Sequence, residues 1–274
     1  MIKKIQSDRI TVIIPTMNRT KLLTRFVKYY EKHCKIKTDY VFVNSNKNRI
    51  AIHGECREII ESGCNKYVDE YIKPSTVGEA RKVGIDIAMS LGNEYILSGD
   101  DDCYIGKLAI EKMLAPLYND SRFWKIGHLG NYRVFMRDFK SNEVRFHLNI
   151  GVFWATKLSV IKDIGNIDKT LSAREDVEMD ANIWDNGGWT AIVDADVKHS
   201  RNQPLEYGER TIPKNYSDEW NAACDLIADR YPNIFKNRNG RLYRQFQLPD
   251  IKFSLSDKLK LEIEDSKQKR LFDA

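Results

Sequence analysis

The stretch that decides the fold is EYILSGDDD, residues 94–102. After Glu94, residues 95–97 are apolar, which is typical of a strand buried inside a sheet. It then runs into three successive aspartates, Asp100, Asp101 and Asp102. Like charges this close disfavour one another unless a cation lies between them. Hard divalent cations take oxygen ligands and often join a carboxylate to phosphate oxygens. The stretch therefore predicts a strand that ends in a site for a metal ion and a diphosphate.

An isolated acidic triplet has a second interpretation, a solvated loop whose aspartates cap a helix that begins near Gly106. The elements around the triplet favour the functional interpretation, because strand-like and helix-like segments alternate through the first hundred residues. This order predicts an α/β fold with a mainly parallel sheet, in which ligands bind beyond the carboxyl ends of the strands. The expected strands cover residues 10–14, 40–43, 67–72 and 94–97, and the expected helices begin at Thr20, near Glu55 and after Thr76.

The second half of the chain predicts a mixed arrangement, followed by a highly charged and peripheral tail after Pro249. The expected strands cover residues 124–129, 132–136, 144–146, 150–154 and 189–193, and the expected helices cover 157–164, 175–184 and 217–230.

Composition limits the class of protein. The chain has 274 residues, of which 42% are hydrophobic and 30% charged, so extensive disorder is excluded. Five cysteines without a C-x-x-C pair favour a reducing compartment over a disulfide scaffold or a zinc knuckle. No apolar run approaches the roughly 20 residues that span a bilayer, and the polar N-terminus lacks a signal-peptide segment. We expect a cytoplasmic protein, in the host cytoplasm if a phage encodes it.

A second acidic pair, Glu175-Asp176, opens a predicted helix. The helix dipole stabilises negative charge there, and a carboxylate so held can deprotonate a hydroxyl group. The same pair is also favourable simply as first-turn acids. Further along, His199 follows a strand-like run, where a single histidine is more often structural than a ligand.

Five segments, in order, resemble the family-2 type of GT-A glycosyltransferases. They are ITVIIPTMNR (10–19), VGEARKVGIDIA (77–88), YILSGDDD (95–102), IGNID with REDVEM (164–179) and VKH (197–199). The resemblance implies a GT-A fold, a Rossmann-like nucleotide-binding mixed sheet flanked by helices. It implies a domain over residues 1–200, with a nucleotide-sugar half to about 105 and an acceptor half from about 106. Residues 201–274 form a small basic helical extension.

The resemblance also implies roles for single residues. Pro15, Thr16, Asn18 and Arg19 line the nucleotide pocket. Arg81 lies near the ribose or diphosphate, and Asp100 and Asp101 face the ribose and sugar. Asp102 and His199 bind Mn²⁺ or Mg²⁺. Asp176, with Glu175 beside it, is the general base of an inverting transfer.

The chain departs from the family at the loop after the second strand. The family usually has an acidic residue there that reads uracil, whereas this loop is Asn44-Ser45-Asn46. Asn44 can hydrogen-bond a base edge in its place, and a UDP-sugar remains the expected donor.

The acceptor is predicted from charge. Residues 230–248 contain no acid, and aromatic residues alternate with their cations. A single basic segment is more often a solvated face, but those at 19–37 and 122–145 add to this one. Together they suit phosphates and stacked bases and predict a polyanionic partner. The cations of the C-terminal segment are Arg230, Lys236, Arg238, Arg241 and Arg244.

Compact size, the basic C-terminal segment and the lack of a membrane anchor resemble the DNA-modifying glycosyltransferases of bacteriophages. These include the family-2-like enzymes associated with TET-type oxygenases. The resemblance implies 5-hydroxymethylcytosine in DNA as the acceptor, reached by base flipping or in the groove. A polysaccharide, lipid-linked or other small saccharide acceptor is the alternative.

Two other classes compete. A sugar-phosphate nucleotidyltransferase normally has a Gly-rich loop after its first strand, where this chain has PTMNR (15–19). A nucleic-acid-binding module without activity leaves the aspartate triplet unexplained.

Overall fold

A computed structural model describes most of the chain. The described residues are 3–6, 9–16, 20–33, 38–45, 67–73, 76–106, 108–128, 139, 143–148, 151, 153–171, 173–195, 197–199, 216–248, 252–254 and 261–264. The helix expected near Glu55 and the strand expected at 132–136 lie outside these residues.

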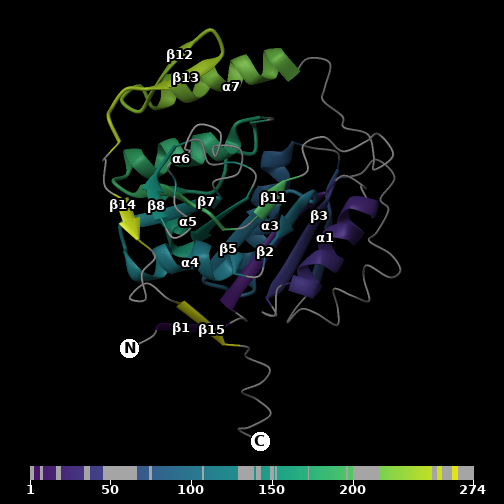
Figure 1. Ribbon diagram of the computed structural model, residues 1–274. Helices are drawn as coiled ribbons and strands as arrows, with labels where there is room; N and C mark the ends of the chain where they lie inside the picture. Colours follow the sequence, from purple (N-terminus) through teal and green to yellow (C-terminus); the bar gives the residue numbers. More distant parts are fainter. Residues whose placement is uncertain are drawn as a thin grey trace, which may run out of the picture.

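Nine strands of the described part form one mixed sheet in the order β14-β8-β10-β7-β9-β5-β2-β3-β4 (Figure 1). Pairing makes β4, β3, β2, β5, β7 and β10 run in one direction, with β9 and β8 opposed to them. The predicted mainly parallel sheet is confirmed. The strands are β2 Ile10–Thr16, β3 Asp39–Asn44, β4 Tyr67–Tyr71, β5 Tyr95–Gly99, β7 Phe123–His128, β8 Glu143–Phe146, β9 Phe153–Lys157, β10 Trp189–Val193 and β14 Lys252–Ser254.

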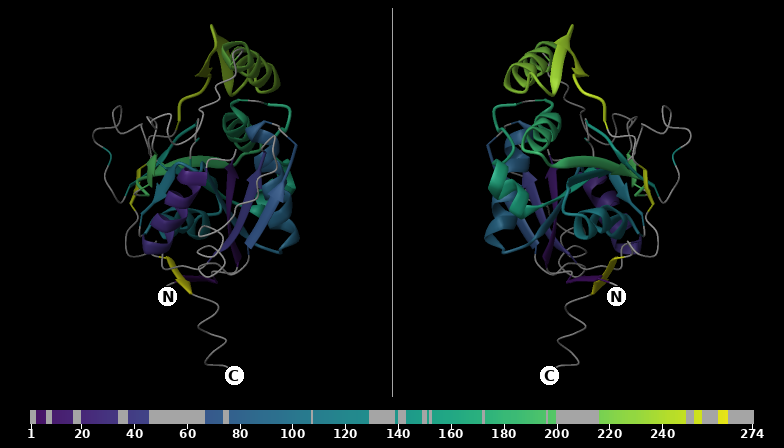
Figure 2. Two further views of the ribbon diagram at one scale, coloured as in Figure 1. Left: turned by 90° about the vertical axis from the view of Figure 1, so that its right-hand side faces the viewer. Right: turned by 90° about the vertical axis from the view of Figure 1, so that its left-hand side faces the viewer.

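Helices cover both faces of the sheet (Figure 2). Alternate residues of β2 enter different cores, which is why its sequence is apolar throughout. Val12 belongs to the core on one face, with residues of α1 (Thr20–His33) and α4 (Ala109–Asn119). Ile13 belongs to the core on the other face, with residues of α3 (Val77–Ser90), α5 (Leu158–Ile164) and α6 (Glu175–Asp185).

The local signals for helices are largely confirmed. Thr76 caps α3, because its hydroxyl accepts a hydrogen bond from the amide of Glu79 at 3.0 Å. The helix expected near Gly106 begins only at Ala109, after a short strand, β6 (Cys103–Ile105). Its N-terminal residue Leu108 makes no side-chain capping bond. The N-cap position of this helix is therefore Leu108 and not a residue of the aspartate triplet.

The C-terminal segment returns to the main sheet. Helix α7 (Tyr216–Arg230) and the hairpin of β12 (Phe235–Arg238) and β13 (Arg241–Arg244) lie above α6 (Figure 1). Beyond them, β14 pairs with β8 at the sheet edge, and β15 (Leu261–Glu264) pairs with β1 (Lys3–Gln6). The tail that we expected to be peripheral thus supplies an edge strand. Within the described part, no helix has the length and apolar character needed to cross a bilayer.

Candidate active site

The acidic triplet lies at the edge of the sheet where the parallel strands end. Thr16 and Asn44, the last residues of β2 and β3, are partners in register, and β5 ends beside them at Gly99. A side chain at 99 would meet Phe153, because a Cβ there would lie 2.4 Å from the ring. Glycine therefore lets the antiparallel strand β9 pack closely where the triplet begins. This is the edge of the sheet at which the sequence predicts a ligand site.

The three aspartates lie in different surroundings. Asp101 is fully buried, and its Oδ2 accepts a hydrogen bond from the Thr16 hydroxyl at 2.8 Å. Asp102 is half-buried immediately before β6. The hydrogen bond from Thr16 fixes the triplet to the end of β2, and the expected position of Asp101 facing the sugar stays a prediction.

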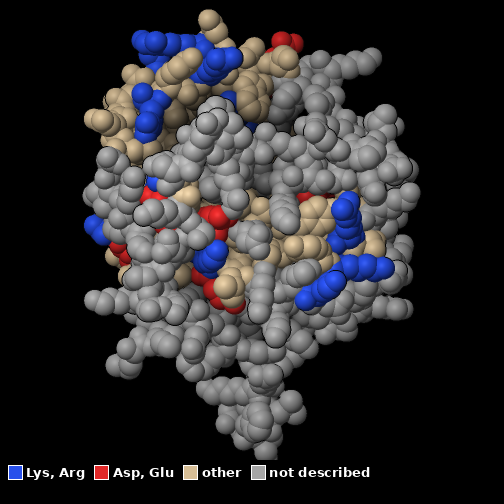
Figure 3. Space-filling model, viewed as in Figure 1, with Lys and Arg blue, Asp and Glu red and all other residues tan. Residues whose placement is uncertain are grey.

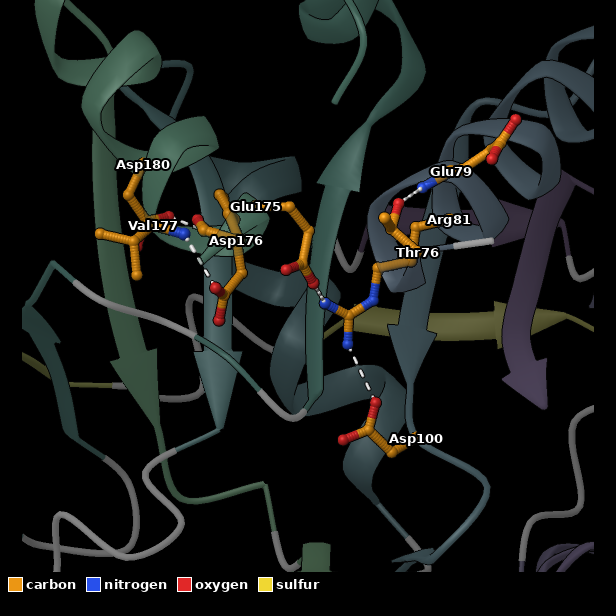
Figure 4. Close-up of polar contacts among 9 residues, drawn as sticks. Thr76, Glu79, Arg81, Asp100, Glu175, Asp176, Val177 and Asp180 are labelled. Atoms are coloured by element: carbon orange, nitrogen blue, oxygen red, sulfur yellow. Dashed lines mark hydrogen bonds and ion pairs between the residues drawn. The ribbon is translucent and has the colours of Figure 1, made fainter. Parts of the chain in front are cut away.

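Arg81 joins both halves of the site from within α3. Its guanidinium donates to Glu175 at the start of α6 and to Asp100 at 3.0 Å (Figure 4). Burial alone would lower the pKa of Arg81, but the carboxylates of Glu175, Asp100 and Asp176 raise it further than burial lowers it. Arg81 is only 4% exposed and contacts carboxylates of the protein, and its expected place near the ribose or diphosphate stays a prediction.

Glu175 is likewise a partner of Arg81 within the protein. Burial raises the pKa of its carboxyl above the usual range, against the attraction of Arg81. We expected Glu175 beside the base as a catalytic group. Its contact with Arg81 joins α6 to α3, and its expected catalytic role stays a prediction.

Asp176 occupies the first turn of α6 and is half-buried. One of its oxygens accepts a hydrogen bond from the amide of Val177 at 3.0 Å, and its carboxylate points away from Arg81 (Figure 4). Gly151, just before β9, lies against it, because a Cβ at 151 would be 2.3 Å from Oδ2 of Asp176. Sequence reasoning missed Gly151, since nothing around it in the chain points to the helix it contacts.

Lys125 makes two hydrogen bonds to α6, which carries Asp176. It belongs to the basic stretch 122–145, but in β7 it is completely buried. Its ammonium donates to Asp180 at 2.8 Å and to the backbone carbonyl of Asp176 at 2.9 Å. It also lies 5.0 Å from the ring centre of Trp154. The available signal was a lysine inside an apolar strand, which needs a buried acid as its partner.

The turn that leads into α6 has an unusual backbone. Arg174 has φ 65°, a left-handed conformation that non-glycine residues seldom adopt. Its guanidinium lies 3.7 Å from the ring centre of Trp220 in α7. A contact from the C-terminal segment therefore accompanies the strained turn that precedes Glu175 and Asp176.

Other expected site residues are only partly described. Asn18 and Arg19 lie outside the described residues, and Pro15 is buried in β2. β11 (Val197–His199) pairs with β6 so that His199 is opposite Cys103, the neighbour of Asp102. Only the backbone of His199 is described. Among the described side chains, no group of three or more His, Cys, Asp or Glu could hold a metal ion by itself.

The basic C-terminal segment forms a hairpin. Arg230 forms ion pairs within the protein, with Asp168 at 2.5 Å and with Glu178 at 3.6 Å. The remaining cations of the segment are exposed, and Figure 3 shows Lys and Arg gathered over this part of the surface. The sequence did contain a hairpin signal, Asn239-Gly240, whose φ angles are 52° and 72°. The exposed cations are Lys236, Arg238, Arg241 and Arg244.

Comparison with known proteins shows the fold. No family model matches the sequence, and no curated protein matches it. Residues 1–349 of TarS from S. aureus, solved with UDP-GlcNAc, align with a TM-score of 0.54 and 18% identity over 80% of this chain and 66% of that one. Another TarS structure is covered over 40% of its length, with 15% identity and a TM-score of 0.54.

A second protein aligns over nearly its whole length. It is glucosyl-3-phosphoglycerate synthase from Mycobacterium tuberculosis, solved with Mn²⁺, UDP and glucosyl-3-phosphoglycerate. The TM-score is 0.53 and the identity 10%, over 93% of this chain and 98% of that one. The chain spans between 40% and 66% of the TarS structures. The expected α/β glycosyltransferase fold is confirmed.

Proposed function

We propose that this protein is a metal-dependent glycosyltransferase that moves a sugar from a UDP-sugar to a hydroxyl acceptor. The observation that carries the proposal is that Arg81 joins Asp100 of the aspartate triplet to Glu175, the neighbour of Asp176, at the carboxyl edge of a glycosyltransferase fold. TarS was solved with UDP-GlcNAc, and the synthase from M. tuberculosis with UDP and Mn²⁺, which supports a UDP-sugar donor.

The ends of β2 and β3 form the proposed nucleotide site. Thr16 and Asn44 are partners in register there, and both are buried at the edge. Asn44 is proposed to hydrogen-bond the base, with Pro15, Asn18 and Arg19 lining the same pocket. Thr16 has a second task, because its hydroxyl holds Asp101.

Asp102 and His199 are the proposed ligands of a divalent cation. The site fits such an ion, because the three carboxylates of Glu175, Asp100 and Asp176 act on the single cation Arg81. Burial raises the pKa of the neighbouring Cys103 thiol well above its usual value, and Asp100 and Asp102 raise it further, as expected in a negative field. When bound, the ion neutralises charge on the leaving diphosphate.

Asp176 is the proposed general base. It accepts the proton of the acceptor hydroxyl, and the oxygen forms a bond to the anomeric carbon. The bond from that carbon to the UDP oxygen breaks, and its electron pair leaves with UDP. A single displacement of this kind inverts the anomeric configuration. Glu175 and Arg81 hold the turn that carries the base, and Asp100 is held by the same guanidinium.

The acceptor that we propose is 5-hydroxymethylcytosine in DNA. The proposal is supported by the exposed cations of the β12–β13 hairpin, which suit a phosphate backbone. The alternative is a saccharide or other small acceptor, favoured by the phosphoglycerate product in the M. tuberculosis structure.

Nucleoside mass spectrometry separates the two acceptors. The protein is incubated with Mn²⁺, a panel of UDP-sugars and either hydroxymethylated or unmodified DNA. We expect a gain of one sugar mass on hydroxymethylcytosine alone, and its loss in Asp176→Asn. Transfer to a small acceptor with no gain on either DNA contradicts the DNA acceptor and retains the glycosyltransferase.

A further inference from the structure

A polar hollow of about 370 Å³ lies where α7, the β12–β13 turn and the start of α6 meet. Among the described residues that line it, none is acidic. Cations and neutral hydrogen-bonding side chains therefore face one space. The lining includes Arg174, Ser217, Trp220, Asn221, Asn239 and Arg241.

Contacts between the walls fix the shape of this hollow. The indole of Trp220 donates to the carbonyl of Gly240 at 3.1 Å, which attaches the hairpin turn to α7. The same indole also contacts Arg174, whose guanidinium lies over the ring at 3.7 Å from its centre. A Cβ at Gly240 would lie 2.0 Å from Oδ1 of Asn221, so the turn and the helix are in close contact. The hollow is thus organised before any ligand enters.

The acids of α7 do not line the hollow. Ser217, Trp220 and Asn221 are three and four residues apart and share one helical face. Asp218 and Glu219 fall on other faces of the same turn. The first turn of a helix also carries amides without helical partners and a partial positive charge. The first turn of α7 thus adds to the two arginines in favouring an anion.

The position of the hollow relates it to the proposed reaction. Arg174 immediately precedes Glu175 and Asp176, so one wall of the hollow is the turn that carries the base. We propose that this hollow binds a phosphate group of the acceptor. The inference rests on the proposed function, and it names a chemical feature of the substrate. Arginine suits phosphate because its planar donors bind two oxygens at once.

Binding of inorganic phosphate tests the site directly. Titration calorimetry is performed with Mg²⁺ and saturating UDP, so that the diphosphate site is filled. The variant is Arg241→Ala, and the matched control is Arg238→Ala, its cross-strand partner outside the hollow. We expect saturable binding that weakens at least tenfold in Arg241→Ala and less than twofold in Arg238→Ala. Equal effects of the two changes, or no saturable binding, overturn the inference.

Competition then identifies the source of the phosphate. A dinucleotide supplies a phosphodiester, and glycerol phosphate supplies a phosphomonoester. Displacement of inorganic phosphate by either one supports the inference and names the acceptor class, and displacement by neither contradicts it. UDP binding is measured first. If UDP binds and phosphate does not, only this inference fails. If UDP does not bind, the proposed function fails. Phosphate binding by the Arg241 and Arg238 variants is then compared in the absence of UDP.

Discussion

Gly151 shows how closely the proposed base is packed. Its α-carbon faces Oδ2 of Asp176 with no room for a methyl group. We expect Gly151→Ala to displace that carboxylate and lower the transfer rate about tenfold or more, since small misplacements of a catalytic group cost about that much. The free energy of unfolding should change by less than about 1 kcal/mol, because the carboxylate can rotate away.

Steady-state kinetics and urea unfolding of the same preparation measure both effects. Asp176→Asn serves as the reference for complete loss of the base. An unchanged transfer rate in Gly151→Ala contradicts the assignment of Asp176.

His147, after β8, predicts how stability depends on pH. Burial, together with the charge of Arg244, lowers the pKa of its imidazole to about 4. The unfolded chain therefore binds a proton near pH 6.5 that the folded chain refuses until about pH 4. Stability is lost as the pH falls through this window, by about 2 kcal/mol between pH 7 and 5. We expect His147→Gln to remove this part of the loss.

Urea unfolding at pH 7 and pH 5 gives the comparison. The difference between wild type and variant isolates His147 from other titrating groups. Equal losses in the two proteins would show that His147 stays accessible to protons in the fold.

The place of a single residue was predictable where its position relative to a strand or helix in the sequence indicates its chemical role. The triplet had to follow a buried strand, and Asp176 had to open a helix, so both positions could be predicted. The burial of Asp101 and Lys125 could not, because it depends on partners in other elements, Thr16 and Asp180.

Helix α6 is the element on which the proposed reaction most depends. It is held from below by Lys125, which bonds both Asp180 and the carbonyl of Asp176. We expect Lys125→Met to destabilise the fold by about 3–5 kcal/mol, because the buried carboxylate of Asp180 loses the cation that it pairs with. The double variant Lys125→Met with Asp180→Leu should recover most of that stability. It should not recover the transfer rate, because the Asp176 carbonyl still lacks the hydrogen bond from the Lys125 ammonium.

Thermal unfolding and the split between kcat and the KM for the donor test this expectation. The matched control is Arg122→Met, which removes an exposed ion pair with Asp120 next to the same strand and should leave both measurements close to wild type. Recovery of kcat together with stability in the double variant shows that Lys125 acts through stability alone.

Strands and helices were predicted well where the pattern of apolar residues was clear. Strands were predicted poorly where they form only by pairing with a strand far away in the sequence. The strands at 10–14, 40–43 and 189–193 were visible as buried apolar runs. β14 and β11 are short, with three residues each, and owe their existence to distant partners, β8 and β6. The β12–β13 hairpin was missed even though Asn239-Gly240 marks its turn.

At the scale of the whole molecule, a small hydrophobic core joins the C-terminal segment to α6, which carries the proposed base. Ile227 and Phe235 of that segment pack with Val177 and Ala181 of α6. Tyr231 adds a hydrogen bond from its hydroxyl to Glu178 at 2.8 Å. In the described part, α6 and α7 therefore share one core across the boundary expected near residue 200.

Substitution in this core tests whether the molecule unfolds as one unit. We expect Ile227→Ala to cost about 2–4 kcal/mol, as for other large-to-small changes in a buried core. A single cooperative transition should remain, shifted in urea and coincident by fluorescence and circular dichroism. Two separate transitions, with only one of them shifted, contradict the shared core.

The overall class followed from the order of strands and helices, and the sheet order did not. Alternation favours parallel pairing, but it does not reveal that β9 enters antiparallel between β5 and β7. That insertion places Gly151 at the active edge, and no local pattern predicts it.

Release of UDP from UDP-sugars tests the central claim most directly. Wild type and Asp102→Ala are assayed with a panel of UDP-sugars, with Mn²⁺ and after chelation of the metal. We expect Mn²⁺-dependent release of UDP from at least one donor by the wild type, and its loss in Asp102→Ala with the fold intact by circular dichroism. No release from any donor, or release that Asp102→Ala leaves unchanged, contradicts a metal-dependent glycosyltransferase centred on the aspartate triplet.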